Sequence, residues 1–314
     1  ESNPGVPLLN RSVMSAYPPG STWKMLVALA SLQEGLITDK TTYVCSGSFQ
    51  YGNKSFACHS HGFVDIRHSL QYSCNVYYYN LGLKLGLERL TKYAKMFGFG
   101  SKTHIDLPSE SSGLFPSSEW WSKKGGFTKG RLVNYGIGQG EINVTPLQMA
   151  VYISAIANEG ILYQPHIVRG IFNNIDNKFQ PIDYSGVVIP IEKQYFKIIK
   201  DGMYNVVNAP GGTAYATFIN SKSYSTDVKV YGKTGTAQNP HGRDHSWFVC
   251  FAERGDSSIA MAVIVENAGF GSEAAAPISF DLIAKYFKTD IIKQSIIPKD
   301  SILADTNKKK TTTN

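Results

Sequence analysis

Residues 17–24 read YPPGSTWK and lead directly into the apolar run MLVALASL at residues 25–32. Proline and glycine break regular structure and serine is a favoured N-cap, so this stretch predicts that a helix of about four turns begins at Ser21 and ends near Gly35. Lys24 then lies one turn further along the same face. A lysine can take the proton of a serine hydroxyl when burial and nearby positive charge favour its neutral form. Ser21 is therefore a candidate nucleophile and Lys24 its candidate base, although S-x-x-K alone is common by chance.

A second motif, SCN at residues 73–75, follows later in the chain. On such a loop the first and third side chains can point into one cleft. Ser73 could there relay a proton, and Asn75 could offer its amide to a peptide substrate. Cys74, between them, is expected to face away from the cleft. Taken alone, this pattern could equally be a helix cap.

A third motif, KTGT at residues 233–236, closes a stretch at residues 228–235 whose alternation and β-branched residues predict a strand. Gly235 would let a substrate backbone lie close to that strand. Lys233, Thr234 and Thr236 form a donor-rich edge that is suited to a carboxylate. KTG alone could be an exposed strand end, but the three motifs in this order make coincidence a poor explanation.

S-x-x-K, S-x-N and K-T-G, in this order, are the motifs of penicillin-binding proteins and class A β-lactamases. On these motifs the chain resembles the penicillin-binding serine transpeptidases, and within them the class B enzymes of the cell-elongation type. The resemblance extends over about residues 4–287. Further stretches that carry it are Asn10-Arg11, FGFG at 97–100, IDLP at 105–108, GIGQG at 136–140, TPLQ at 145–148, GTA at 212–214, GTAQ at 235–238 and RDH at 243–245.

This resemblance implies one transpeptidase domain over residues 1–287, with an α/β fold of the α+β type. Its parts would be a mostly antiparallel five-stranded sheet flanked by helices and an inserted all-helical subdomain at roughly residues 36–160, with the active site between them. Periodicity agrees with this architecture. It predicts helices at 65–85, 87–97, 145–160, 191–207 and 275–287, and an antiparallel meander of strands at 228–235, 246–253 and 258–266. We also expect a long ordered loop at 109–130, a turn at Tyr51-Gly52-Asn53 and disorder in the tail at 288–314.

The function that the resemblance implies is D,D-transpeptidation of peptidoglycan stem peptides, with β-lactams as inhibitors. Ser21 would attack the penultimate D-Ala carbonyl with Lys24 as base, and an amine of a neighbouring stem would resolve the acyl-enzyme. Ser73 with Lys233 would pass a proton to the leaving amine. The backbone N–H groups of Ser21 and Thr236 would form the oxyanion hole. This chemistry requires no cofactor.

Two other functions stay open at this stage. One is hydrolysis, by a D,D-carboxypeptidase or a β-lactamase, and the other is a β-lactam-sensing or scaffold domain that is acylated but never turns over. Glu110 lies near the place where class A β-lactamases carry the glutamate that activates the deacylating water. The chain reads ESSG at 110–113 instead of their E-x-x-L-N, so hydrolysis is not supported. His245 is interpreted as a locally hydrogen-bonded residue and not as a general base.

Partners and location are also implied by the resemblance. They are a RodA-type glycan polymerase, an MreC-type scaffold and an inner-membrane anchor outside this chain, with the catalytic domain in the periplasm. The formal net charge is +7 and includes a basic C-terminal tail. No aromatic-and-basic motif points to nucleic acid as a partner.

Three of the four cysteines, Cys45, Cys58 and Cys74, fall in one segment that ends in the SCN motif, whereas Cys250 lies in an apolar stretch typical of a core. Cys58-x-x-His61 is a metal-like half-site, so we expect Cys45, Cys58, His61 and Cys74 to bind one structural zinc. The family that the chain resembles has a metal site here made from Asp, His and Cys, and Cys45 and Cys58 stand where Asp residues would be expected. A Cys45 to Cys58 disulfide, the default in an exported protein, and His59 in place of His61 are the alternatives.

Overall fold

The structure is a computed structural model that describes residues 6–175, 177–225 and 227–288. The tail for which the sequence predicts disorder therefore lies outside the described residues, apart from Lys288. In the described residues, no helix combines the length and the apolarity that a membrane span requires.

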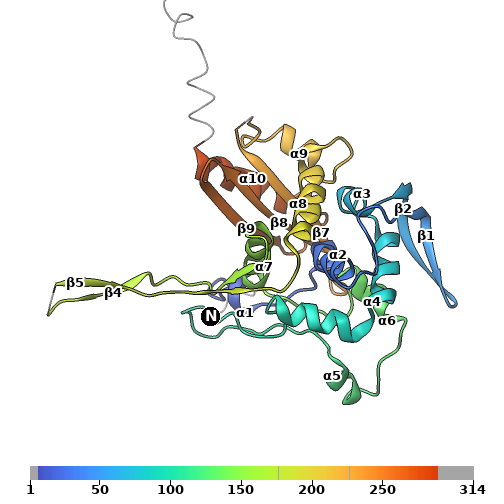
Figure 1. The fold of residues 1–314 in the computed structure, drawn as a ribbon, viewed down its shortest axis with the longest axis horizontal. Helices are drawn as coiled ribbons and strands as arrows, with labels where there is room; N and C mark the ends of the chain where they lie inside the picture. Colours follow the sequence, from blue (N-terminus) through green and yellow to red (C-terminus); the bar gives the residue numbers. More distant parts are fainter. Residues whose placement is uncertain (1–5, 176, 226, 289–314) are drawn as a thin grey trace, which may run out of the picture.

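Helices and strands are mixed along the chain (Figure 1). The helices are α1 (Arg11–Met14), the 3-10 helix η1 (Gly20–Trp23), α2 (Lys24–Gln33), α3 (Ile66–Gln71), α4 (Asn75–Met96), α5 (Ser118–Ser122), α6 (Arg131–Gly136), α7 (Pro146–Ala157), α8 (Lys193–Asn208), α9 (Tyr215–Ile219) and α10 (Ala275–Phe287). The strands are β1 (Tyr43–Tyr51), β2 (Lys54–Val64), β3 (Ile161–Tyr163), β4 (Gly170–Asn173), β5 (Lys178–Pro181), β6 (Gly186–Val188), β7 (Lys229–Ala237), β8 (His245–Arg254) and β9 (Ser257–Val265).

The central sheet has the strand order β7-β8-β9 and is antiparallel throughout, which confirms the predicted meander. Three strands are present among the described residues, where the resemblance implied five. The middle strand β8 is apolar on both faces. Trp247 and Phe251 belong to the hydrophobic cluster that contains α2, whereas Phe248 packs in a second cluster with Phe218 of α9 and Phe280 of α10. The sheet is thus covered by helices on both faces, as a strand without polar alternation requires.

Helix α2 runs through the centre of the molecule, and every residue from Met25 to Leu32 is buried. A helix that is apolar all round belongs in a core. Its first turn differs from the prediction, because Ser21 lies inside the 3-10 turn η1 and is not an N-cap. The physical reason is the approach to β7: Gly20 has φ +55°, and a Cβ there would lie 2.4 Å from the carbonyl oxygen of Thr236. The close contact with the strand therefore tightens the start of the helix.

The segment predicted as one helix at residues 65–85 is two helices in the structure. α3 ends at Gln71 and α4 begins at Asn75, and Ser73 between them has φ +54°. Hydrophobic periodicity continues across this break, so it could not be seen in the pattern. A second interruption, at Gly86 with φ 72° and ψ 172°, separates the two predicted helices at the place expected.

The subdomain at residues 36–160 is not all-helical, and this expectation was wrong. It contains the antiparallel hairpin β1–β2, which packs beside α4 and is the blue pair of strands at the right of Figure 1. Tyr51 pairs with Lys54 across the hairpin end, so the turn predicted at residues 51–53 is confirmed. The strands consist largely of exposed and half-buried residues and are rich in Ser, Gly and Cys, with one valine in each, so the β-branched signal for a strand is weak.

Other elements agree with the prediction. Thr145 and Gln148 form a reciprocal capping box at the start of α7. The predicted loop at 109–130 contains only the short helix α5. A long arm made of β4 and β5 extends away from the body of the molecule at the left of Figure 1.

Candidate active site

The three motifs line one cavity of about 740 Å³, although they are far apart in the sequence. Ser21 comes from η1, Ser73 and Asn75 from the α3–α4 junction, and residues 234–236 from β7. The structure therefore brings together the candidate catalytic and substrate-binding residues that the sequence predicts. The two lysines lie beneath this lining and are fully buried.

Lys24 joins the first motif to the second. Its Nζ donates to the Ser73 carbonyl oxygen at 2.8 Å, to Ser73 Oγ at 3.2 Å and to Asn75 Oδ1 at 2.7 Å. In the described part of the chain it makes no hydrogen bond to the Ser21 hydroxyl. Burial lowers the pKa of Lys24 to about 8, against the smaller opposing effect of Cys58 and Cys74. A sizeable neutral fraction near neutral pH is what a general base needs.

Lys233 joins the second motif to the third. Its Nζ donates to Ser73 Oγ at 2.9 Å and to the Thr234 carbonyl oxygen at 3.0 Å. Burial, and then the positive charge of Lys24, hold the pKa of Lys233 well below its usual range. The Ser73 hydroxyl thus lies between two buried amines, and this arrangement can move a proton from one to the other.

The β7 strand forms the wall of the cavity and is an edge strand of the sheet. At Gly235 a Cβ would lie 2.7 Å from Thr22 Cγ2, so only glycine fits the contact between strand and η1. Thr234 Oγ1 shares a hydrogen bond of 2.7 Å with Thr213 Oγ1. The GTA stretch therefore adds a hydroxyl to the predicted carboxylate site, a contribution that the sequence did not reveal.

Gln139 is a second site residue that sequence reasoning missed. It is buried, lines the cavity and donates from Nε2 to the Thr236 carbonyl oxygen at 2.9 Å. The N–H of Gln238 donates to its Oε1 at 3.4 Å. In the sequence, Gln139 is distinguished only by its position in GIGQG, a stretch that carries the family resemblance but to which the sequence analysis assigns no role. The Gln139 side chain therefore makes hydrogen bonds to the unpaired edge of β7 that a neighbouring strand would otherwise make.

Glu110 and His245 lie outside the catalytic contacts. The Glu110 carboxylate is buried and accepts hydrogen bonds from the Thr103 N–H, the Thr103 hydroxyl and the His104 N–H. It does not line the cavity and cannot activate a water beside Ser21. His245 Nδ1 accepts from the Asn267 N–H at 3.0 Å, which confirms its interpretation as a locally bonded residue.

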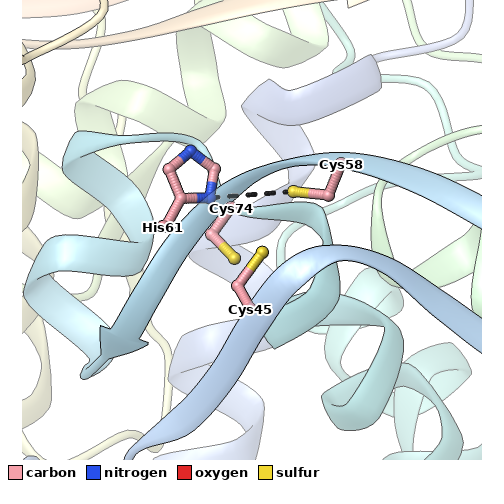
Figure 2. A group of neighbouring side chains, drawn as sticks. All are labelled: Cys45, Cys58, His61 and Cys74. Atoms are coloured by element: carbon pink, nitrogen blue, oxygen red, sulfur yellow. Dashed lines mark hydrogen bonds between the residues drawn. The ribbon is translucent and has the colours of Figure 1, made fainter.

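Behind the SCN loop, four side chains converge on one point (Figure 2). The ligand atoms of Cys45, Cys58, His61 and Cys74 all lie within 4.8 Å of one another, and Cys58 Sγ is 3.8 Å from His61 Nδ1. This residue set is the one predicted for zinc, with His61 and not His59 in the cluster. All four cysteines of the chain are free thiols in the structure.

Irregular pairing of the hairpin explains how Cys58 and His61 reach the same side. Residues three apart in a regular strand point to opposite faces. Here Cys45 pairs with Gly62, Ser46 with Ser60 and Ser48 with Ala57, so the pairing shifts twice, once at His61 and once opposite Gly47. A bulge re-aims the side chains that follow it. Neither the bulge nor its consequence could be inferred from the C-x-x-H spacing alone.

The cluster is chemically suited to a divalent soft metal. Hydrogen bonds from the Cys74 thiol and from the N–H groups of Val76 and Asn75 lower the pKa of Cys58 to about 4 against the effect of burial. The Cys58 hydrogen bond raises the pKa of Cys74, so in the absence of metal the two sulfurs share one proton. The Asn75 N–H donates to Cys58 Sγ at 3.1 Å. Three cysteine sulfurs and one imidazole are the donor set that structural zinc sites of the Cys₃His type use.

Comparisons with known proteins agree with this geometry. The family described as penicillin binding protein transpeptidase domain matches residues 1–284. The peptidoglycan D,D-transpeptidase MrdA of Haemophilus influenzae is 32% identical over 303 residues, which cover 89% of this chain and 46% of that relative.

Solved structures are similar over most of the chain. The crystal structure of Pseudomonas aeruginosa PBP2 in complex with WCK 5153 has a TM-score of 0.80 and 33% identity, and the match covers 91% of this chain and 62% of that one. The complex between PBP2 and MreC from Helicobacter pylori has a TM-score of 0.77 and 30% identity, with 90% of this chain and 51% of that one covered. The chain thus spans less than half the length of the curated relative.

Proposed function

The chain belongs to the family of penicillin-binding protein transpeptidase domains, and on this premise we propose that it is the catalytic part of a peptidoglycan D,D-transpeptidase of the cell-elongation type. The observation that carries the proposal is the convergence of two buried lysines on the Ser73 hydroxyl, in the cavity that contains Ser21. Members of this family need no cofactor for the acyl transfer.

In the acylation step, Ser21 Oγ attacks the carbonyl of the penultimate D-Ala and its proton passes to neutral Lys24. The tetrahedral intermediate then collapses, the peptide C–N bond breaks, and the leaving D-Ala amine takes a proton through Ser73. Lys233 lies on the other side of Ser73 and can restore that proton. The N–H groups of Ser21 and Thr236 are the proposed oxyanion donors.

In the second step, the amine of another stem peptide attacks the ester carbonyl and loses a proton through Ser73 to Lys233, which is neutral once it has given up its own proton in acylation. The new amide forms as the Ser21 oxygen leaves and takes back the proton held by Lys24. Thr234, Thr213 and Thr236 are the proposed partners of the terminal carboxylate of the donor. Gly235 allows the donor backbone to lie against β7, where its amides can pair with the open strand edge.

Hydrolysis is the competing function, and Glu110 argues against one form of it, because its oxygens are fully engaged away from the cavity. The experiment that separates the functions is incubation of the domain with a thioester stem-peptide mimic, with and without a D-amino acid acceptor. A transpeptidase yields the transfer product and slows hydrolysis when the acceptor is present. Fast hydrolysis of penicillin would indicate a β-lactamase, and a stable adduct with no transfer would indicate a sensor or scaffold.

We further propose a structural zinc on Cys45, Cys58, His61 and Cys74. The support is the donor set and its contact with the site: Asn75 bonds to Cys58 Sγ through its N–H and to Lys24 through its side chain. The metal would stiffen the SCN loop from behind and take no part in the acyl transfer. Metal analysis of protein purified without chelator should find about one zinc per chain. Zinc-free, fully active protein with a Cys45 to Cys58 disulfide would overturn this proposal.

The intact protein is proposed to be anchored in the inner membrane with this domain in the periplasm. A RodA-type glycan polymerase and an MreC-type scaffold are its proposed partners, and the H. pylori PBP2–MreC complex is a structural neighbour that supports the second. Depletion should make rod-shaped or helical cells round. A failure of septation at normal cell width would point to the division-type enzyme instead.

A further inference from the structure

Asp244 is the single carboxylate that lines the cavity among the described residues, and no lysine or arginine lines it. The other lining side chains are hydroxyls, amides, aromatic rings, histidines and a thiol. A half-buried carboxylate in a cavity that no lysine or arginine lines is a suitable partner for a positively charged group of a ligand, because charge-assisted hydrogen bonds are stronger than neutral ones. This residue has no part in the acyl transfer described above.

The loop after β7 holds Asp244 in place. The Asn239 N–H donates to Asp244 Oδ1 at 3.3 Å, and the Gly269 N–H donates to the Asp244 carbonyl oxygen at 2.9 Å. Asn239 in turn donates from Nδ2 to Asn267 Oδ1 at 2.7 Å, which joins the two loops. Among the described residues no cation forms an ion pair with Asp244, so its second carboxylate oxygen is available to a ligand.

The direction of a donor peptide along β7 leads towards Asp244. The β7 residues that line the cavity begin at Thr234, whose hydroxyl meets that of Thr213, and the lining continues past the strand to Gln238. If the terminal carboxylate binds at Thr234, the rest of the peptide therefore extends along β7 towards Gln238. An extended strand rises about 3.3 Å per residue, so Thr234 to Gln238 spans roughly 13 Å. The residue before the two terminal ones then lies about halfway along this span, and its side chain can extend to the far end.

We propose that Asp244 binds the ammonium group of a diamino acid that precedes the reacting D-Ala of the donor stem peptide. This inference rests on the proposed function and names its substrate class. A cross-link between stems needs a primary amine on the acceptor, and because donor and acceptor come from one polymer, the donor carries the same amine. A charged hydrogen bond at Asp244 then selects amine-bearing stems and keeps the side chain of the donor away from the ester that it could otherwise attack.

The test uses two thioester donors that are identical except that the side-chain amine of the residue before D-Ala is free in one and acetylated in the other. Acylation of Ser21 is followed by intact-protein mass spectrometry, with benzylpenicillin as a third acylating agent that carries no ammonium. We expect the wild type to prefer the free amine about tenfold, the order of a hydrogen bond between charged groups. In Asp244→Asn the preference should fall to about one with the benzylpenicillin rate unchanged, and Asp244→Glu should restore part of it.

Asp256→Asn, in the exposed turn between β8 and β9, is the matched control and should keep the full preference. Equal rates for the two thioesters in the wild type would overturn the inference. An equal loss for all three reagents in Asp244→Asn would also overturn it, because that pattern is expected if Asp244 only positions the loop. Failure of every reagent to acylate the wild type would instead contradict the proposed function, so the two failures can be told apart.

Discussion

The two sides of the SCN loop contact different kinds of chemical group: lysine amines on the cavity side, and thiols and an imidazole on the rear side. On the cavity side, Ser73 contacts the amines of Lys24 and Lys233, and Asn75 contacts that of Lys24. Burial disfavours the charged form of both amines, which makes proton exchange through Ser73 possible. On the rear side, Cys74 faces sulfur and imidazole, which can hold a metal cation and keep it there. One short loop therefore contacts the two buried lysines on one face and the proposed metal ligands on the other. The comparison shows that one face of a three-residue loop can supply groups that react, while the opposite face can fix the position of the loop.

On the cavity side, removal of the nucleophile should have the largest effect on acylation. Ser21→Ala should abolish the covalent adduct with β-lactams completely, because no other hydroxyl occupies its position on η1. Intact-protein mass spectrometry detects the adduct as a mass increase. Ser48→Ala on β1 is the control and should be acylated like the wild type. An adduct that persists in Ser21→Ala would show that the nucleophile is assigned wrongly.

Lys24→Ala should be nearly as damaging to acylation while the fold survives. Loss of a general base is worth about 10²–10⁴ in rate, and here it also removes three hydrogen bonds that orient the SCN loop. The rate of penicillin acylation measures the effect, and circular dichroism checks folding. A variant that is folded and acylates at the wild-type rate would exclude Lys24 as the base.

Cys74→Ser tests the rear side without touching a group that lines the cavity. We expect loss of bound zinc, a lower melting temperature and slower acylation, because the loop loses its anchor. Cys250→Ala is the comparison, since Cys250 is a buried core cysteine on β8 and its loss should cost stability but retain the metal. If both variants keep about one zinc per chain, the site is not the proposed one.

The pH dependence of acylation sharpens the contrast. The base must be neutral, and the pKa of Lys24 is about 8, so its neutral fraction rises roughly tenfold per pH unit below 8 and levels off above it. The acylation rate constant should follow the same curve from pH 6 upwards. A rate that falls over this interval, or that is already level at pH 6, would mean that another group limits the reaction.

Gln139→Ala should have the smallest effect. It removes a hydrogen bond to the Thr236 carbonyl oxygen, of the order of 1 kcal/mol, so acylation should slow by about fivefold. Gln139→Glu keeps the size of the side chain but replaces its N–H donor with an acceptor, and it should slow acylation at least as much. Unchanged kinetics in both variants would show that β7 keeps its position without this contact.

Much of the site was predictable because each motif places its side chains by local geometry. Ser21 and Lys24 share a helical face, and KTGT ends a strand whose alternation is visible in the chain. The predicted meander of three strands and the helices at 191–207 and 275–287 also correspond to β7–β9, α8 and α10. Thr213 and Gln139 were not assigned roles, because their contacts join segments that are distant in sequence and leave no local pattern.

The sequence by itself determined the order of the three motifs and identified the four candidate metal ligands, because residue chemistry and spacing are local properties. The 3-10 start of α2, the break at Ser73, the hairpin β1–β2 and its bulge at His61 were not. Each of these depends on contact with another segment: Gly20 against β7, the SCN loop against Lys24, and β2 against β1. A positive φ or an irregular strand pairing is adopted only when packing against another segment offsets its strain. Only the tertiary structure therefore decides where these features occur.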